Sequence, residues 1–274
     1  MLIPLRNYSN YSICESNIKI DDLVNFAEKE KLPAIALTDY KLLSGVLEFS
    51  IKCQKKGIQP IIGLDVDYLS ILKNYSRLTI LSKNENGFKN LNILSTKINT
   101  ENDFQLSLKN IKDFSDGNIL ILGGLYSYFE DLNINKNNLK VILDEINTLK
   151  KMFNSDIFFE LDENLDNNLL NEISQKCNIN CFLSSFSFYK QKKDFDAIKI
   201  LHCLKNGEYL QNTSFKLKNN YSLTKSHQNI DKFSQLIKNS NLISNKINFL
   251  IEEKNITLPN FESGLDSNED KEII

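Results

Sequence analysis

Tryptophan is absent from this chain, and histidine and arginine contribute only two residues each. The histidines are His202 and His227, and the arginines are Arg6 and Arg77, so lysine supplies nearly all of the positive charge. The formal net charge of −2 and the pI near 5.9 exclude a surface field that would draw nucleic acid toward the whole chain. We therefore expect little direct nucleic-acid binding.

Long hydrophobic runs are missing as well. No apolar run approaches the roughly 20 residues that cross a bilayer, and the N-terminus has no basic segment followed by an apolar one. The sequence therefore predicts a cytoplasmic protein that does not contact the membrane.

Cysteine is sparse and lacks the paired spacing of a disulfide framework or a zinc knuckle. Cys177 and Cys181 could form half of a metal site, but nothing in the sequence supplies the other half. We expect reduced, mostly buried thiols that pack as small apolar side chains. The complete set is Cys14, Cys53, Cys177, Cys181 and Cys203.

The remaining composition, 41% hydrophobic and 25% charged, is typical of a globular protein, and 274 residues fit one large domain or two small ones. Helical patterns follow most runs of strand-forming residues, which predicts an α/β fold with a parallel sheet closed or nearly closed into a barrel. An open doubly wound sheet is the alternative. The seven expected strands cover residues 2–7, 34–38, 60–67, 77–81, 118–122, 157–161 and 180–184. The clearest helical patterns cover residues 22–31, 139–153, 165–176 and 195–204.

The most informative pattern is a strand, a helix and a second strand within residues 32–66. A short apolar run ends at Asp39, helical spacing then continues to Gly57, and residues 60–66 return as a parallel strand. In such units, functional groups gather at the carboxyl ends of the strands. Asp39 and Asp65 lie near such ends and are candidate site residues.

Several segments resemble the PHP (polymerase and histidinol phosphatase) domain that opens the alpha subunit of bacterial DNA polymerase III. The similarity is specific in the first ninety residues and looser between residues 98 and 156. The matching segments are LRNYSNYS (5–12), KIDDLVNFAEKEKLPAIALTDYKLLSGVLEF (19–49), GIQPIIGLDV (57–66), RLTILSKNENGFKNL (77–91), IFFEL (157–161), LSSFSFY (183–189), DFDAIKILHCLKNGEYL (194–210) and NITLPNF (255–261). The resemblance implies a distorted seven-stranded (β/α) barrel with a C-terminal helical and linker extension.

The resemblance and the change in composition beyond Gly207 divide the chain into three parts. Residues 1–210 are expected to form the barrel, and residues 211–258 a helical C-terminal part of the same domain, with an amphipathic pattern over residues 231–243. Residues 259–274 are acidic and poor in core residues, which predicts a linker toward polymerase modules that this sequence does not contain.

Active members of this superfamily bind divalent metals at the barrel mouth, mainly through histidine and acidic ligands, and hydrolyse phosphoesters with metal-bound water. Carried over onto this sequence, the two histidines of the first motif fall on Arg6 and Tyr8, and the acidic residue soon after it falls on Glu15. The histidine that follows the Thr-Asp pair falls on Tyr40. The acidic residue of the Gly-x-Glu motif is Asp65.

The remaining ligand positions have also lost their metal-binding side chains. The histidine ahead of the Leu-Thr strand becomes Arg77, and the cysteine or histidine of the mid-chain motif becomes Gly124. The final Asp-x-His pair becomes Phe186 and Phe188, which would share a strand face and could fill the barrel mouth. Ordinary core packing of these two aromatics is nearly the same prediction.

Among the carried-over positions, only Glu15 and Asp65 can still bind metal, with Asp39 nearby. Scattered carboxylates of this kind cannot hold a multinuclear metal cluster. His202 and His227 lie outside every ligand position, and we expect them to be packing or surface residues. The resemblance therefore implies no catalytic residue, no bound metal and no cofactor.

The two arginines suggest what replaces the metal. Both occupy ligand positions, so we hypothesise that Arg6 and Arg77 place fixed positive charges opposite Glu15, Asp39 and Asp65. Carboxylates gathered in a partly buried pocket would repel one another and lose solvation unless a cation compensates them. The alternative is that one arginine is a solvated strand residue and the other covers a sheet edge.

The resemblance implies a catalytically silent PHP domain of a replicative polymerase alpha subunit, acting as a scaffold. Its implied partners are the rest of the alpha subunit and the proofreading exonuclease subunit. Although the family is that of a DNA-directed DNA polymerase, nucleotide transfer by this chain alone is not expected, because the polymerase modules are absent. The alternatives are a metal-dependent phosphoesterase or 3′–5′ exonuclease of the same superfamily, and a decaying gene product without a separate function.

Overall fold

The computed structural model of this protein describes residues 1–127, 129, 136–215, 217, 220–223 and 233–252. Within these residues, six strands form one sheet in the order β1-β2-β3-β4-β5-β6. They confirm six of the seven expected strands. The strands are β1 (Ala34–Leu37), β2 (Gln59–Leu69), β3 (Tyr75–Ser82), β4 (Asn118–Gly123), β5 (Ile157–Leu161) and β6 (Cys181–Leu183).

The helices confirm the four clearest helical patterns at nearly the expected bounds. None of the described helices is long and apolar enough to span a membrane. The helices are α1 (Ile20–Lys29), α2 (Val46–Lys55), α3 (Glu85–Thr100), α4 (Lys136–Met152), α5 (Asn168–Cys177), α6 (Phe195–Asn206) and α7 (Ser234–Asn245). Short 3₁₀ turns cover Ile111–Phe114, Lys192–Asp194 and Leu210–Asn212.

Strand direction in the sheet is mixed, whereas the sequence predicted a parallel sheet. β1 and β2 are parallel, and so are β4, β5 and β6, but β3 runs antiparallel to both of its neighbours. The reason is the short link between β2 and β3, residues 70–74. A link of this length returns as a hairpin, while a parallel return needs a crossover of about a dozen residues or more.

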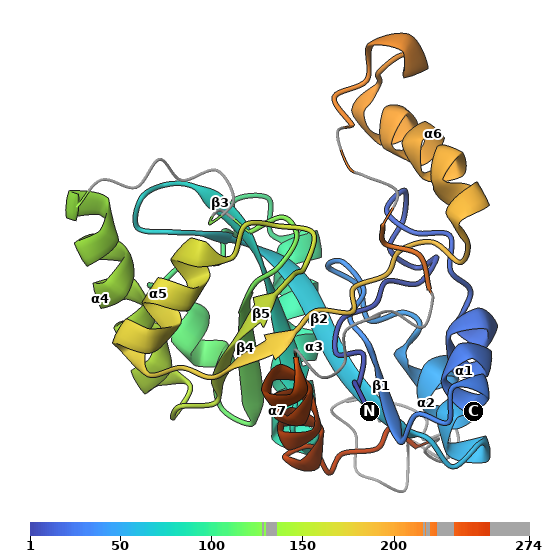
Figure 1. The fold of residues 1–274 in the computed structure, drawn as a ribbon, viewed down its shortest axis with the longest axis horizontal. Helices are drawn as coiled ribbons and strands as arrows, with labels where there is room; N and C mark the ends of the chain where they lie inside the picture. The colour runs from blue at the N-terminus through green and yellow to red at the C-terminus, as the bar shows by residue number, and fades with distance from the viewer. Residues whose placement is uncertain (128, 130–135, 216, 218–219, 224–232, 253–274) are drawn as a thin grey trace, which may run out of the picture.

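The seventh expected strand, residues 2–7, is wrong as a strand, although the segment lies where a closing strand would lie. The carbonyl of Pro4 accepts from the N–H of Ala36 in β1 at 2.9 Å, and Asn7 forms a parallel bridge to Ser187 beyond β6. Pro4 has no N–H to donate, so a continuous ladder cannot form here. The segment therefore lies between the two edges of the curled sheet, beside β1 (Figure 1).

Both sides of the curled sheet are buried, which explains why β1, β4 and β5 are buried throughout. Helices α1 and α2 pack on one part of the outer side, and α3, α4 and α5 pack on another (Figure 1). A separate apolar cluster fills the inside, where small alanines of β1 leave room for larger side chains. Its members are Ile3, Leu5, Ala34, Ala36, Ile61, Leu81, Ile119, Ile121, Phe158, Phe182, Ile243 and Ile247.

Helix α7 is packed on the barrel wall. Its Ser240 hydroxyl accepts from the N–H of Ile3 at 3.2 Å, and the Asn239 amide donates to the carbonyl of Cys181 at 2.6 Å. Ile243 of the same helix belongs to the inner apolar cluster. The expected amphipathic helix over residues 231–243 is thus present as α7. The expected linker, residues 259–274, lies outside the described residues.

All five cysteines lie in the described part of the chain and are unpaired. Cys53, Cys177 and Cys203 are buried, and Cys14 and Cys181 are partly buried. Burial raises the pKa of the Cys53 thiol to about 12, so this side chain stays a protonated, apolar packing group.

Candidate functional site

The centre of the barrel mouth is the buried guanidinium of Arg6. It donates to Asp65 Oδ2 and to Glu160 Oε2, each at 2.9 Å, and to the carbonyl of Leu125 at 3.1 Å. All three charged side chains are at most 1% exposed, so water does not screen these ion pairs. Although burial opposes the charge, the nearby carboxylates raise the pKa of Arg6 well above its ordinary value.

Asp65 accepts two further hydrogen bonds. The Tyr8 hydroxyl donates to Oδ2 in a very short bond, and the Thr79 hydroxyl donates to Oδ1 at 3.0 Å. Burial and the charge of Asp65 raise the pKa of Tyr8 well above its usual range, so the phenol keeps its proton and remains a donor. Together with Arg6, these groups occupy both oxygens of Asp65.

Glu160 contributes a second carboxylate from the end of β5. Its Oε1 accepts from the Ser184 hydroxyl at 2.6 Å, while Oε2 accepts from Arg6. Burial raises the pKa of Glu160, and these two bonds offset only part of that rise. The strands β2 and β5 bring Asp65 and Glu160 to the same mouth, as expected for carboxyl ends of strands in a curled sheet.

Gly124, the mid-chain ligand position, carries no side chain because the ion pair occupies that space. A Cβ built at Gly124 would lie 2.1 Å from Glu160 Oε2 and 3.0 Å from Arg6 Nη1. The backbone φ of +67° is also in the left-handed region that favours glycine. Both the conformation and the contact therefore require glycine here.

Arg77, which lies in β3, forms the second ion pair of the mouth. Its two terminal nitrogens donate to the two oxygens of Glu15, at 2.8 and 3.1 Å. The guanidinium carbon also lies 3.9 Å from the centre of the Tyr40 ring and 4.4 Å from that of Tyr126. Arg77 additionally donates to the Tyr8 hydroxyl at 3.1 Å, which links the two ion pairs.

The outer rim of the mouth is paired in the same way. The Tyr40 hydroxyl and the Lys41 ammonium both bond to Asp67 Oδ2, at 2.6 Å each. Lys205 of α6 reaches Glu15 Oε1 at 2.5 Å. Burial acts to raise the pKa of Glu15, but the bonds from Arg77 and Lys205 outweigh it and lower that pKa to about 2.

These contacts confirm that both guanidiniums face carboxylates, with one correction. Asp39 is not a partner of either arginine. It accepts instead from the Ser9 N–H at 2.6 Å and from the hydroxyls of Ser9 and Ser12 at 2.7 and 2.6 Å. Burial raises the pKa of Asp39, and the serine bonds act in the opposite direction. The loop after residue 8 thus wraps the carboxylate with local donors before any arginine can reach it.

Phe186 and Phe188 are buried beside the ion pairs. Their ring centres lie 5.4 Å apart, Phe186 meets the Tyr8 ring edge-on at 4.8 Å, and the Arg6 guanidinium lies 4.7 Å from the Phe186 ring centre. They follow β6 in an irregular segment, with a bridge only at Ser187. The aromatics therefore pack against the mouth, as expected, but not from within a strand.

The two histidines are not part of this site in the described structure. His202 lies on α6, where its ring packs 5.1 Å from that of Phe215 and bonds to Ser214 and Asn206. This is the packing role expected from the sequence. His227 lies outside the described residues.

This donor set does not fit a divalent metal. The oxygens of Asp65 and Glu15 are occupied by arginine and hydroxyl donors, and the fixed positive charges of Arg6 and Arg77 would repel a cation. Among the residues that the structure describes, no group of three His, Cys, Asp or Glu side chains could hold a metal ion.

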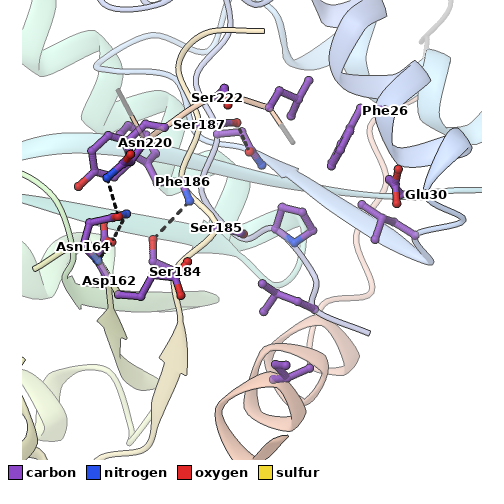
Figure 2. A pocket seen from close by; sticks show the side chains of 18 of the residues that line it. Phe26, Glu30, Asp162, Asn164, Ser184, Ser185, Phe186, Ser187, Asn220 and Ser222 are labelled. Atoms are coloured by element: carbon purple, nitrogen blue, oxygen red, sulfur yellow. Dashed lines mark hydrogen bonds between the residues drawn. The ribbon is translucent and has the colours of Figure 1, made fainter. Parts of the chain in front are cut away.

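A cavity of about 550 Å³ lies near this site but is distinct from it (Figure 2). Its polar side includes Asp162 and Asn164, which are hydrogen-bonded to each other, and its far side includes Phe26 of α1. Of the residues predicted for the metal site, only Phe186 lines this cavity. The arginine pairs therefore face the closed mouth and not this open space.

Sequence reasoning missed Glu160, Tyr126 and the two serines that hold Asp39. The signal for Glu160 was available, because it is an acid near the end of a predicted strand, as Asp65 is. Tyr126 and the serines had no such signal. Their roles depend on loop conformation, including a left-handed backbone at Tyr126 with φ of 68°.

Residues 4–164 match the family model described as PHP domain. Among curated proteins, the chain is similar to the DNA polymerase III subunit alpha of Buchnera aphidicola subsp. Acyrthosiphon pisum, at 29% identity over 96% of this chain and 24% of that protein. It is similar to the subunit of the same name from Rickettsia conorii, at 27% identity over 94% of this chain and 23% of that protein. The chain thus spans about a quarter of the length of these relatives.

Solved structures include a distant match, an amidohydrolase from Chromobacterium violaceum, at 10% sequence identity and a TM-score of 0.47. The match covers 73% of this chain and 97% of that one. A likeness at this level is too distant to bear on function.

The contact at Gly124 predicts a large cost for adding one methyl group. Gly124→Ala should lower the free energy of unfolding by more than about 3 kcal/mol, because a left-handed backbone penalty adds to overpacking against Glu160. Gly57→Ala is the matched control, since Gly57 has the same φ of +67° but nothing within 4 Å of its Cβ. Urea unfolding of both variants measures the difference. Equal losses would show that the space beside Glu160 is not closed.

The lowered pKa of Glu15 predicts a pH dependence. Because the folded pKa near 2 lies below the ordinary 4.5, the carboxylate stabilises the fold above about pH 4.5, and this stabilisation is lost as the pH falls toward 2. Glu15→Gln should therefore cost up to about 3 kcal/mol at neutral pH, and the difference from wild type should shrink in acid. Urea unfolding across this range measures it. Glu172→Gln, at an exposed ion pair, should show almost no difference at any pH.

Proposed function

The chain belongs to the PHP domain family, and we propose that it is the N-terminal domain of a DNA polymerase III alpha subunit in which ion pairs have replaced the metal site. In this role it is a non-catalytic scaffold for DNA replication. It supports the polymerase polypeptide and offers a docking surface for the proofreading exonuclease subunit.

The observation that carries the proposal is the pair of arginines at carried-over ligand positions. Arg6 bonds to Asp65, and Arg77 bonds to Glu15, which are the two positions where a metal-binding carboxylate has been kept. Each acid has therefore lost its expected metal and gained a guanidinium. A guanidinium neutralises a carboxylate, but it has no open coordination position at which to activate water.

The proposal also accounts for the loss of side chains at the remaining positions. Gly124 leaves room for Glu160, while Phe186 and Phe188 pack the mouth with apolar surface. Each of these changes removes a ligand and fills or closes the resulting space. A site that still hydrolysed phosphoesters would need both an accessible metal and room for water and substrate.

The similarity to alpha subunits over nearly the whole chain supports the replication role. Because the chain spans only about a quarter of those relatives, the activity and partners of the whole subunit enter as part of this proposal. The exonuclease partner follows from the family resemblance.

Metal analysis separates the scaffold from a phosphoesterase. The purified chain should hold no stoichiometric zinc, manganese or iron, its melting temperature should not change with chelator, and it should not hydrolyse a phosphodiester with any of these metals added. Elemental analysis, calorimetry and a chromogenic diester assay measure the three properties. Stoichiometric metal with hydrolysis that is lost in Asp65→Asn, yet kept in the control Asp67→Asn, would establish the enzyme instead.

The scaffold role predicts association with the proofreading exonuclease subunit of the same organism. Mixed in equal amounts, the two proteins should elute together from a sizing column, while an unrelated exonuclease of similar size and charge should elute separately. If the chain binds neither that subunit nor the remainder of the alpha subunit, the scaffold role is wrong.

A further inference from the structure

Exposed apolar side chains concentrate at one place in the described structure. Twelve large hydrophobic residues are exposed, and four of them lie within eleven consecutive residues of α6 and the turn that follows it. Their exposed fractions are 49% for Ile200, 70% for Leu204, 83% for Tyr209 and 56% for Leu210. Scattered exposed apolar residues need no explanation, but a cluster of this kind marks an interaction site.

The cluster lies on the side of α6 that faces away from the barrel. Ile200 and Leu204 are four residues apart and share one side of the helix. The opposite side carries Phe195 and Ile198, which are buried in the aromatic cluster with Tyr8 and Phe186. Figure 1 shows α6 standing apart from the sheet and from the other labelled helices. The outer side is therefore left without a partner among the described residues.

The turn after α6 is held in place by polar contacts. Gly207 ends the helix with a left-handed backbone at φ of 64°, and Glu208 then bonds to the N–H and hydroxyl of Ser214 at 2.8 and 2.6 Å. His202 also contacts Ser214 at 3.1 Å. Tyr209 and Leu210 thus extend from a defined turn, and the cluster is a preformed surface.

The size of the cluster decides which kind of partner it fits. With roughly 200 Å² for each large side chain, the exposed fractions leave on the order of 500 Å² of apolar surface. A stable interface between separate proteins buries about 800 Å² on each partner. Interfaces between domains of one polypeptide are smaller, at about 600–1,500 Å² in total. Covalent linkage also supplies a high effective concentration, so a modest surface is sufficient.

We propose that the outer side of α6, formed by Ile200, Leu204, Tyr209 and Leu210, docks within the same polypeptide, onto the body that makes up the other three quarters of the matched alpha subunits. This inference rests on the proposed function, because it requires the chain to be a domain of such a subunit. The surface that receives α6 is apolar, because Lys199 and Lys205 at its border already pair with acids of this domain.

Hydrogen exchange in the full-length alpha subunit tests the proposal. The amides of residues 198–210 should exchange at least about tenfold more slowly there than in the 274-residue chain, which corresponds to about 1.4 kcal/mol of added protection. Equal exchange in the two proteins would overturn the proposal.

A pair of charged substitutions identifies the surface. In the full-length subunit, Ile200→Glu with Leu204→Glu should abolish the added protection. The control is Leu47→Glu with Ile93→Glu, on α2 and α3, because these residues are 42% and 50% exposed and lie outside the cluster. The control should keep the protection. Both doubly substituted 274-residue chains should melt like wild type, since all four residues are exposed.

Two further measurements separate the outcomes. Self-association of the 274-residue chain at micromolar concentration, lost in the Ile200→Glu and Leu204→Glu variant, would overturn the proposal in favour of a second copy. Protection that appears only after the exonuclease subunit is added would overturn it in favour of that partner. Bound metal with hydrolysis, in contrast, would sink the proposed scaffold function without changing the exchange of α6.

Discussion

The guanidinium of Arg6 is the interaction on which the rest of the barrel mouth depends. It joins the N-terminal segment to β2 through Asp65 and to β5 through Glu160, with no water between the charges. Burying three charges is unfavourable unless each is paired and hydrogen-bonded, and removing one partner leaves an uncompensated charge that costs about 3–5 kcal/mol. The glycine at position 124, the protonated Tyr8 and the packing of Phe186 all follow from keeping this arrangement intact.

The second arginine extends the same principle toward the surface. Arg77 neutralises Glu15 between two aromatic rings, and its contact with the Tyr8 hydroxyl joins the outer pair to the inner one. Fixed cations thus lie where the family resemblance expects metal ligands. They preserve charge balance among the remaining acids without offering Lewis acidity, which agrees with a domain whose proposed purpose is assembly.

Much of the fold could be predicted because it depends on local patterns. Six of seven strands and the helices α1, α4, α5 and α6 follow runs of strand formers and helical spacing. The failures have specific causes. The direction of β3 is set by a short link whose length a pattern of strands does not weigh, and Pro4 interrupts a ladder that the apolar run over residues 2–7 suggested.

By itself, the sequence determined the class of the fold, the family and the positions at which metal ligands are missing, because each of these is recorded in residue type and order. Only the tertiary structure decided which charge meets which. Asp39 and Asp65 are equivalent as strand-end acids, yet two serines enclose the first and Arg6 reaches the second. Pairing depends on the curl of the sheet and on loop conformation, which bring together residues up to 154 positions apart.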